Sequence, residues 1–198
     1  MSQVDLRQWW MTSFNSSERS FIETKYQPLG SIDKLPNRLF ALPKSSALEY
    51  LSNLATWFSK PESYQIAKRI LEKADEFVPE TKNIMDLHFH WQNRLMIYYR
   101  NRETDPVALD KAIESCTKQI QISDKAIVAF RKEFGSSLPM HKGFEQLAII
   151  REKQGKYQEV IDICQKAMQQ GWAGSWQKRI EKTRKKIMSS KSIGTEGT

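Results

Sequence analysis

The chain has 198 residues, of which 39% are hydrophobic and 27% are charged, and its formal net charge is +8 at pH 7. This length and polarity allow one domain or one short repeat array with a sizeable core. No apolar run approaches the ~20 residues that a membrane span needs, and residues 1–10 lack the apolar core of a secretion signal. We therefore expect a cytoplasmic protein that does not enter a membrane.

The residue types favour helices over sheets. Glycines and prolines are few, at eight and seven, and good helix formers such as Leu, Ala, Lys, Glu and Gln dominate. The composition therefore predicts an all-α fold. The two cysteines, Cys116 and Cys164, fall at apolar helical positions, so we expect buried free thiols rather than a disulfide or a redox pair.

Residues 1–44 are predicted to form a separate N-terminal helical segment that ends in a linker. A short helix is expected over residues 5–12, and Asn15 with Glu18 has the capping-box spacing that begins a second helix. Pro36 and Pro43 interrupt the linker over residues 31–44. We expect the aromatic side chains of this segment to pack on the first helix pair, with an exposed docking patch as the alternative. These aromatic residues are Trp9, Trp10, Phe14 and Phe21.

Two stretches read as pairs of antiparallel helices joined by a turn. The first has helices over residues 47–59 and 62–77, begun by Ser45 or Ser46 and closed by Pro79. The second runs from Phe144 to Ala167 with a turn at residues 154–156. Small residues stand where the helices must touch, and large apolar residues recur around them at helical spacing. The small residues are Ala55, Ala67 and Ala74 in the first pair and Ala148 and Ala167 in the second.

Both stretches resemble the tetratricopeptide repeat (TPR), a helix-turn-helix unit that stacks into a solenoid. The fits cover about residues 48–81 and 141–174, and Leu147–Tyr157 is also similar to a segment of small bacterial repeat proteins. In the second stretch Arg151, Val160 and Trp172 replace the aromatic, alanine and proline of the family pattern. The resemblance implies a TPR-like antiparallel helix-pair solenoid over residues 45–188.

In that family the first helices of successive units line a concave groove, where an extended peptide or a helix binds. When the groove positions of the family are transferred to this sequence, the resemblance implies that solvent-facing residues of the first helices form the groove. These residues are Glu49, Asn53, Thr56 and Lys60 in the first stretch and Lys142, Gln146, Ile149 and Lys153 in the second. Ser52 and Thr56 replace the first lysine and the asparagine of the carboxylate clamp in chaperone-binding members, so that subclass is not expected.

The region between the two stretches is irregular. Helices are expected over residues 83–101, from Thr104 or Asp105 to Ile120, and over residues 124–134. The repeated small residues lie 45 and 48 positions apart (Ala67, Ala112, Val160), whereas a strict array would repeat every 34 residues or so. The middle unit is therefore expected to have a longer helix and loop than the family pattern.

A final helix over residues 176–188 is expected to carry a basic face, followed by a disordered tail over residues 189–198. From residue 177 onward there are seven basic and two acidic residues. As a polar end cap, this helix would keep the array soluble; as an electrostatic footprint, it would contact nucleic acid or an acidic protein. The basic patch consists of Lys178, Arg179, Lys182, Arg184, Lys185 and Lys186.

No motif in the sequence predicts catalysis, a metal site or a cofactor. His88 and His90 flank Phe89, but on a helix alternate side chains diverge by about 200° and do not share an ion. We therefore expect a non-enzymatic adaptor that binds a protein segment in a TPR groove, with nucleic-acid or acidic-partner binding through the basic helix as the alternative. Truncation after Gln177 is expected to abolish the second kind of binding and to spare the first.

Overall fold

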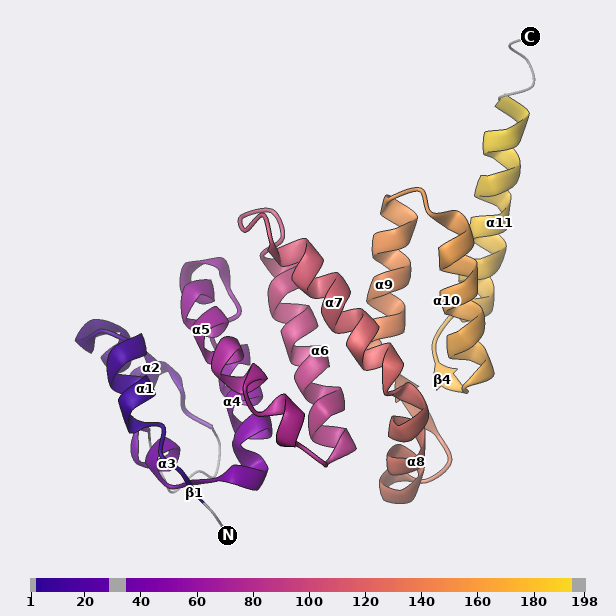
Figure 1. The fold of residues 1–198 in the computed structure, drawn as a ribbon. Helices are drawn as coiled ribbons and strands as arrows, with labels where there is room; N and C mark the ends of the chain where they lie inside the picture. Colours follow the sequence, from indigo (N-terminus) through magenta and orange to yellow (C-terminus); the bar gives the residue numbers. More distant parts are fainter. Residues whose placement is uncertain (1–2, 29–34, 194–198) are drawn as a thin grey trace. The chain divides into compact units, whose positions relative to one another are not determined.

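The structure is a computed structural model that describes residues 3–28 and 35–193 (Figure 1). The described residues are mostly helical, and their few strands are two or three residues long, so the predicted all-α class is correct. The chain divides into two compact units, Met1–Leu109 and Asp110–Thr198. Within the described residues, no helix is long and apolar enough to cross a membrane.

Unit 1 begins with strand β1 (Gln3–Val4) and helices α1 (Arg7–Ser13) and α2 (Ser16–Lys25). The predicted capping box is present: Asn15 Oδ1 accepts the Glu18 N–H at 2.9 Å, and Glu18 Oε2 accepts the Asn15 N–H at 2.9 Å. The predicted linker contains a one-turn helix, α3 (Asn37–Phe40), and strand β2 (Leu42–Pro43), which pairs antiparallel with β1. Residues 29–34 of this linker lie outside the described part.

The N-terminal aromatic residues mostly pack inward. Trp10 and Phe14 are each 1% exposed, Trp9 is half-buried, and Phe21 remains exposed. The guanidinium of Arg69, in the second helix of the first predicted pair, lies 4.8 Å from the centre of the Phe14 ring and forms an ion pair with Glu18. The segment therefore packs on the first predicted helix pair, as expected, and leaves only part of its aromatic surface in solvent.

The rest of unit 1 consists of α4 (Ala47–Thr56), α5 (Tyr64–Asp75) and α6 (Ile84–Arg100). Single 3₁₀ turns precede or connect them at Lys44–Ser46, Pro61–Ser63 and Val78–Glu80. Helix α4 packs against α5 and α6, and its face toward them holds the buried Leu51, Leu54 and Ala55. The expected serine cap of α4 is wrong, because the Ser46 hydroxyl instead donates to the Pro43 carbonyl at 3.2 Å.

A buried polar network, which the sequence did not indicate, joins α4, α5 and α6. His90 Nδ1 lies 2.7 Å from Ser52 Oγ, and His90 Nε2 lies 3.0 Å from Asp75 Oδ1. Asp75 Oδ2 also accepts a 3.2 Å hydrogen bond from Arg94 Nε, and Arg94 is only 3% exposed. The Arg94 guanidinium also lies 5.1 Å from the centre of the Tyr98 ring. The Asp75 carboxylate and this ring therefore both stabilise the buried cation.

His88 makes unit 1 sensitive to mild acid. The side chain is 2% exposed, and burial lowers its pKa from 6.5 to about 4. As pH falls from 6.5 towards 4, the unfolded chain binds this proton while the folded chain does not, so stability declines. The difference of two to three pKa units corresponds to about 3 kcal/mol. We expect His88→Gln to remove this part of the pH dependence, measured as urea unfolding of both proteins between pH 7 and pH 4. Equal declines in the two proteins would contradict the assignment.

Unit 2 holds helices α7 (Ala108–Gln121, beginning at the boundary), α8 (Ser123–Phe134), α9 (Lys142–Lys153), α10 (Tyr157–Gln169) and α11 (Trp176–Ile193). Helix α10 packs against both α9 and α11. Strands β3 (Leu138–Met140) and β4 (Trp172–Ala173), which were not predicted, pair in parallel. Helix α11 ends five residues later than expected, so residues 189–193 are helical; residues 194–198 of the predicted tail lie outside the described part.

Close helix packing in unit 2 depends on small residues. Ala148 on α9 and Ala167 on α10 are completely buried, as expected. A Cβ atom at Gly143 would lie 2.7 Å from Gln119 Oε1 and 3.1 Å from the Cys116 carbonyl oxygen, both on α7. Glycine therefore allows α9 to approach α7 more closely than any side chain would permit.

Candidate interaction cleft

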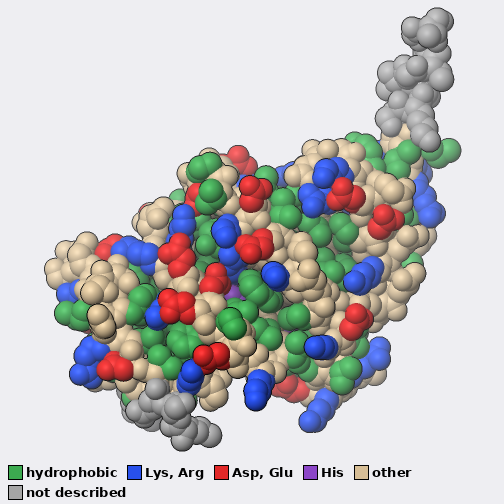
Figure 2. Space-filling view, viewed as in Figure 1, with side chains coloured by type: hydrophobic (Ala, Val, Ile, Leu, Met, Phe, Trp, Pro, Cys, Tyr) green, Lys and Arg blue, Asp and Glu red, His purple; other side chains and the backbone are tan. Residues whose placement is uncertain are grey.

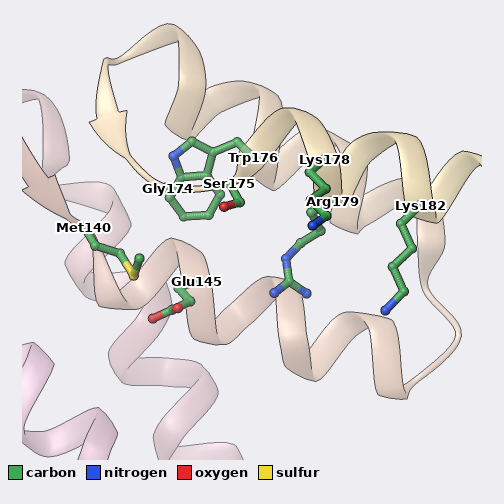
Figure 3. Close-up of a pocket in the computed structure, with 8 residues that line it drawn as sticks. All are labelled: Met140, Glu145, Gly174, Ser175, Trp176, Lys178, Arg179 and Lys182. Carbon is green, nitrogen blue, oxygen red and sulfur yellow. The ribbon is translucent and has the colours of Figure 1, made fainter.

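The candidate site in unit 2 is a cleft between the start of α9 and the start of α11 (Figure 3). Its volume is about 300 Å³. Figure 3 shows Arg179 and Lys182 extending from α11 on the side of α9, with Met140 and Trp176 at the other end. The cleft thus has a basic wall and an apolar end. Its lining residues are Met140, Glu145, Gly174, Ser175, Trp176, Lys178, Arg179 and Lys182.

Glu152 fixes the basic wall against α9. Its carboxylate accepts hydrogen bonds from Arg179 Nη1 at 2.9 Å and from Lys186 Nζ at 2.6 Å. The hydrogen bond from Lys186, together with the nearby positive charges, keeps the pKa of Glu152 below its usual value. Glu152 is therefore ionised at neutral pH, and it joins the last turns of α9 to α11 through Arg179 and Lys186.

The remaining lysines of the wall are not neutralised in this way. Lys178 and Lys182 are exposed and form no ion pair with another described residue, although Lys182 helps to lower the pKa of Glu152. The one acidic residue in the lining, Glu145, already pairs with Lys142 at 2.8 Å. The cleft therefore has an excess of positive charge. Figure 2 shows Lys and Arg side chains along the visible edge of α11.

The cleft includes part of the predicted basic patch and none of the predicted groove residues. From the predicted basic patch, Lys178, Arg179 and Lys182 line it, Lys186 anchors it, and the exposed Arg184 and Lys185 do not belong to its lining. From the predicted groove set, Lys142 contacts the lining through Glu145. The other three groove residues, Gln146, Ile149 and Lys153, lie on α9 outside the lining.

Sequence reasoning missed Met140, Glu145, Glu152 and Trp176 as residues of the site. A signal was present for the two acids, because Glu145 and Glu152 are seven residues apart, which places them on one face of a helix. No comparable signal existed for Met140 or Trp176. The pairing of β3 with β4 brings Met140 beside Ala173, close in the chain to Trp176, and this pairing was not predicted.

The proposed truncation after Gln177 would not separate the two kinds of binding. Ile180 and Thr183 of α11 are buried in the interface of unit 2, and α11 packs on α10. Removal of α11 would expose the core of the unit and destroy the cleft at the same time. Charge-changing substitutions on the exposed lysines are the cleaner test.

The predicted groove residues of unit 1 border a second, smaller cleft. Glu49 and Asn53 of α4 line it together with Asp86, Phe89 and Asn93 of α6, and its volume is about 110 Å³. Burial, and then the charge of Glu49, raise the pKa of Asp86. The other two predicted residues do not line this cleft: the Thr56 hydroxyl donates to the Asn53 carbonyl, and Lys60 lies exposed beyond the end of α4.

Ser52 and His90 also line this smaller cleft, and with Asp75 they have the residue types of a hydrolase triad. The geometry favours a structural role instead. Ser52 is 1% exposed, and the 3.0 Å contact between His90 Nε2 and Asp75 Oδ1 lacks the alignment of a hydrogen bond. A nearly buried serine, and an imidazole that is not hydrogen-bonded to its carboxylate, are expected of a packed polar network.

The two cysteines are poor nucleophiles. Both are buried and free, as predicted. Burial raises the pKa of Cys116 to about 12 and that of Cys164 to about 11, so both remain thiols at neutral pH. Within the described residues, no group of three or more His, Cys, Asp or Glu side chains is placed to hold a metal ion.

Comparison with known proteins adds no relative. No family model, no curated protein and no solved structure matches the chain.

Proposed function

We propose that the protein is a non-enzymatic interaction scaffold built from TPR-like helix pairs, and that its α9–α11 cleft binds a segment of another protein. Two helix pairs with buried alanines at their contacts support the TPR-like assignment. The observation that carries the proposal is that α9, the first helix of the second pair, and the basic helix α11 line one cleft. In TPR proteins the surface beside a first helix is the one that holds a peptide.

A protein segment suits this cleft better than nucleic acid does. Binding to a phosphate backbone relies on dense, unopposed positive charge, whereas Arg179 and Lys186 here are already paired with Glu152. Single-stranded nucleic acids also stack on exposed aromatic rings, and Trp176 is 5% exposed. An apolar end with Met140 and Trp176, flanked by charged side chains, fits a protein interface, which has an apolar centre and a polar rim.

A random peptide library selected on the immobilised full chain tests this function. We expect enriched peptides that bind the parent at least tenfold more tightly than a variant with both Lys178→Glu and Lys182→Glu. The matched control carries Lys125→Glu and Lys132→Glu, which change the same charge at exposed positions on α8. No enrichment, or equal loss in both variants, would contradict a peptide-binding cleft.

A further inference from the structure

Resting on the proposed function, we infer that the α9–α11 cleft selects an extended acidic segment, with two carboxylates at alternate positions beside one apolar residue. The acidic preference follows from charge that is not neutralised within this chain. The two acids next to the wall, Glu145 and Glu152, are already engaged by basic residues of this chain at 2.6–2.9 Å. Lys178 and Lys182 have no such partner among the described residues, so their positive charge is available to the carboxylates of a ligand.

The spacing of the two lysines determines the spacing of the two carboxylates that they can bind. Lys178 and Lys182 are four residues apart on α11, which separates them by about 6 Å along the helix axis. In an extended peptide, side chains two residues apart point to the same face and are about 6.6 Å apart. Two acidic residues at alternate positions therefore match the two lysines, whereas adjacent acidic residues would point one carboxylate away from the wall.

The apolar end of the cleft can accept an apolar side chain of the ligand. Met140 is exposed at this end, and Trp176, which is 5% exposed, also belongs to the lining. The indole N–H of Trp176 is already used, because it donates to the Trp172 carbonyl at 2.7 Å. The remaining surface is apolar, so it suits an aliphatic side chain. That residue would stand two positions from the nearer acidic residue, so that all three side chains point to the same face of the extended peptide. The complementary pattern is apolar-x-acidic-x-acidic, or its reverse for the opposite chain direction.

Fluorescence polarisation with labelled synthetic peptides tests the pattern on the full chain. The reference peptides contain leucine and two glutamates in that alternation, in both directions, between glycines. We expect at least one of them to bind about tenfold more tightly than its double Glu→Gln analogue and more tightly than a peptide with adjacent glutamates. We also expect the difference to shrink between ~20 mM and ~0.5 M salt, because exposed charge pairs are screened.

A charge swap gives the decisive result. The variant with Lys178→Glu and Lys182→Glu should lose the acidic peptides and gain a preference for analogues with lysine in place of glutamate. The control with Lys125→Glu and Lys132→Glu should keep the preference of the parent. Circular dichroism establishes that both variants are folded, which is expected because the anchoring pairs of Glu152 are untouched.

The outcomes separate the two proposals. Equal binding of the glutamate and glutamine peptides, or of the alternate and adjacent acids, overturns the acidic pattern. If neutral library peptides bind and are lost only in the cleft variant, the pattern is wrong while the proposed function stands. If no peptide binds in the cleft, both are wrong. Displacement of the acidic peptides by a single-stranded oligonucleotide at lower concentration would also overturn the inference.

Discussion

Replacement of Ala148 by arginine is expected to unfold unit 2. Ala148 lies in the middle of α9 and is 0% exposed, in a helix that packs against α10. A guanidinium on a long side chain cannot fit there, and an unpaired charge cannot be buried at acceptable cost. The expected destabilisation exceeds about 4 kcal/mol, beyond the range of most single substitutions. Urea unfolding followed by circular dichroism measures it.

The matched control is Ala173→Arg, the same change at an exposed residue of β4 in the same unit. It should shift the unfolding free energy by less than about 1 kcal/mol. If Ala148→Arg lowers the unfolding free energy no more than this control does, Ala148 does not lie at a helix crossing, and the description of packing in unit 2 is wrong. Ala67→Arg, at a fully buried position of α5, is expected to have the corresponding effect on unit 1.

The sequence predicted local structure well because helix caps and helix faces depend on residues that are close together in the chain. The spacing of Asn15 and Glu18 predicted a capping box, and both of its hydrogen bonds form. Apolar periodicity with buried alanines predicted α4, α5, α9 and α10 to within a few residues at their ends, because one face of each helix must leave water.

Features that depend on contacts between distant residues were not predicted. The β3–β4 pairing joins residues more than thirty positions apart by backbone hydrogen bonds. Strands of two or three residues are too short to have a side-chain pattern that would predict their pairing. The cleft was missed as a unit for the same reason. Its residues come from α9, α11 and two connecting segments, so the basic helix and the groove helix looked like two separate sites in the sequence.

The burial of Arg94 is the clearest feature that the sequence did not predict, because it depends on a carboxylate from another helix. Within α6, Arg94 follows the apolar spacing of Trp91 and Tyr98 closely enough to enter the core, where Asp75 Oδ2 accepts its hydrogen bond at 3.2 Å. Asp75→Ala removes the carboxylate and leaves a buried cation without its acidic partner. We expect a loss of about 3 kcal/mol in the unfolding free energy of unit 1, measured by urea denaturation at pH 7.

The control is Glu72→Ala, which removes an exposed carboxylate from the same helix, α5, and should cost less than about 1 kcal/mol. Arg94→Met in the Asp75→Ala background should recover part of the loss, because a methionine of similar length buries no charge. A double-mutant cycle over these two residues gives their coupling. If Asp75→Ala costs no more than Glu72→Ala, the ion pair between Asp75 and Arg94 contributes little to the stability of unit 1. If the loss appears and the double variant recovers part of it, the part-exposed Asp75 carboxylate stabilises unit 1 by compensating the charge of the buried Arg94, and a methionine at position 94 would release Asp75 from that role.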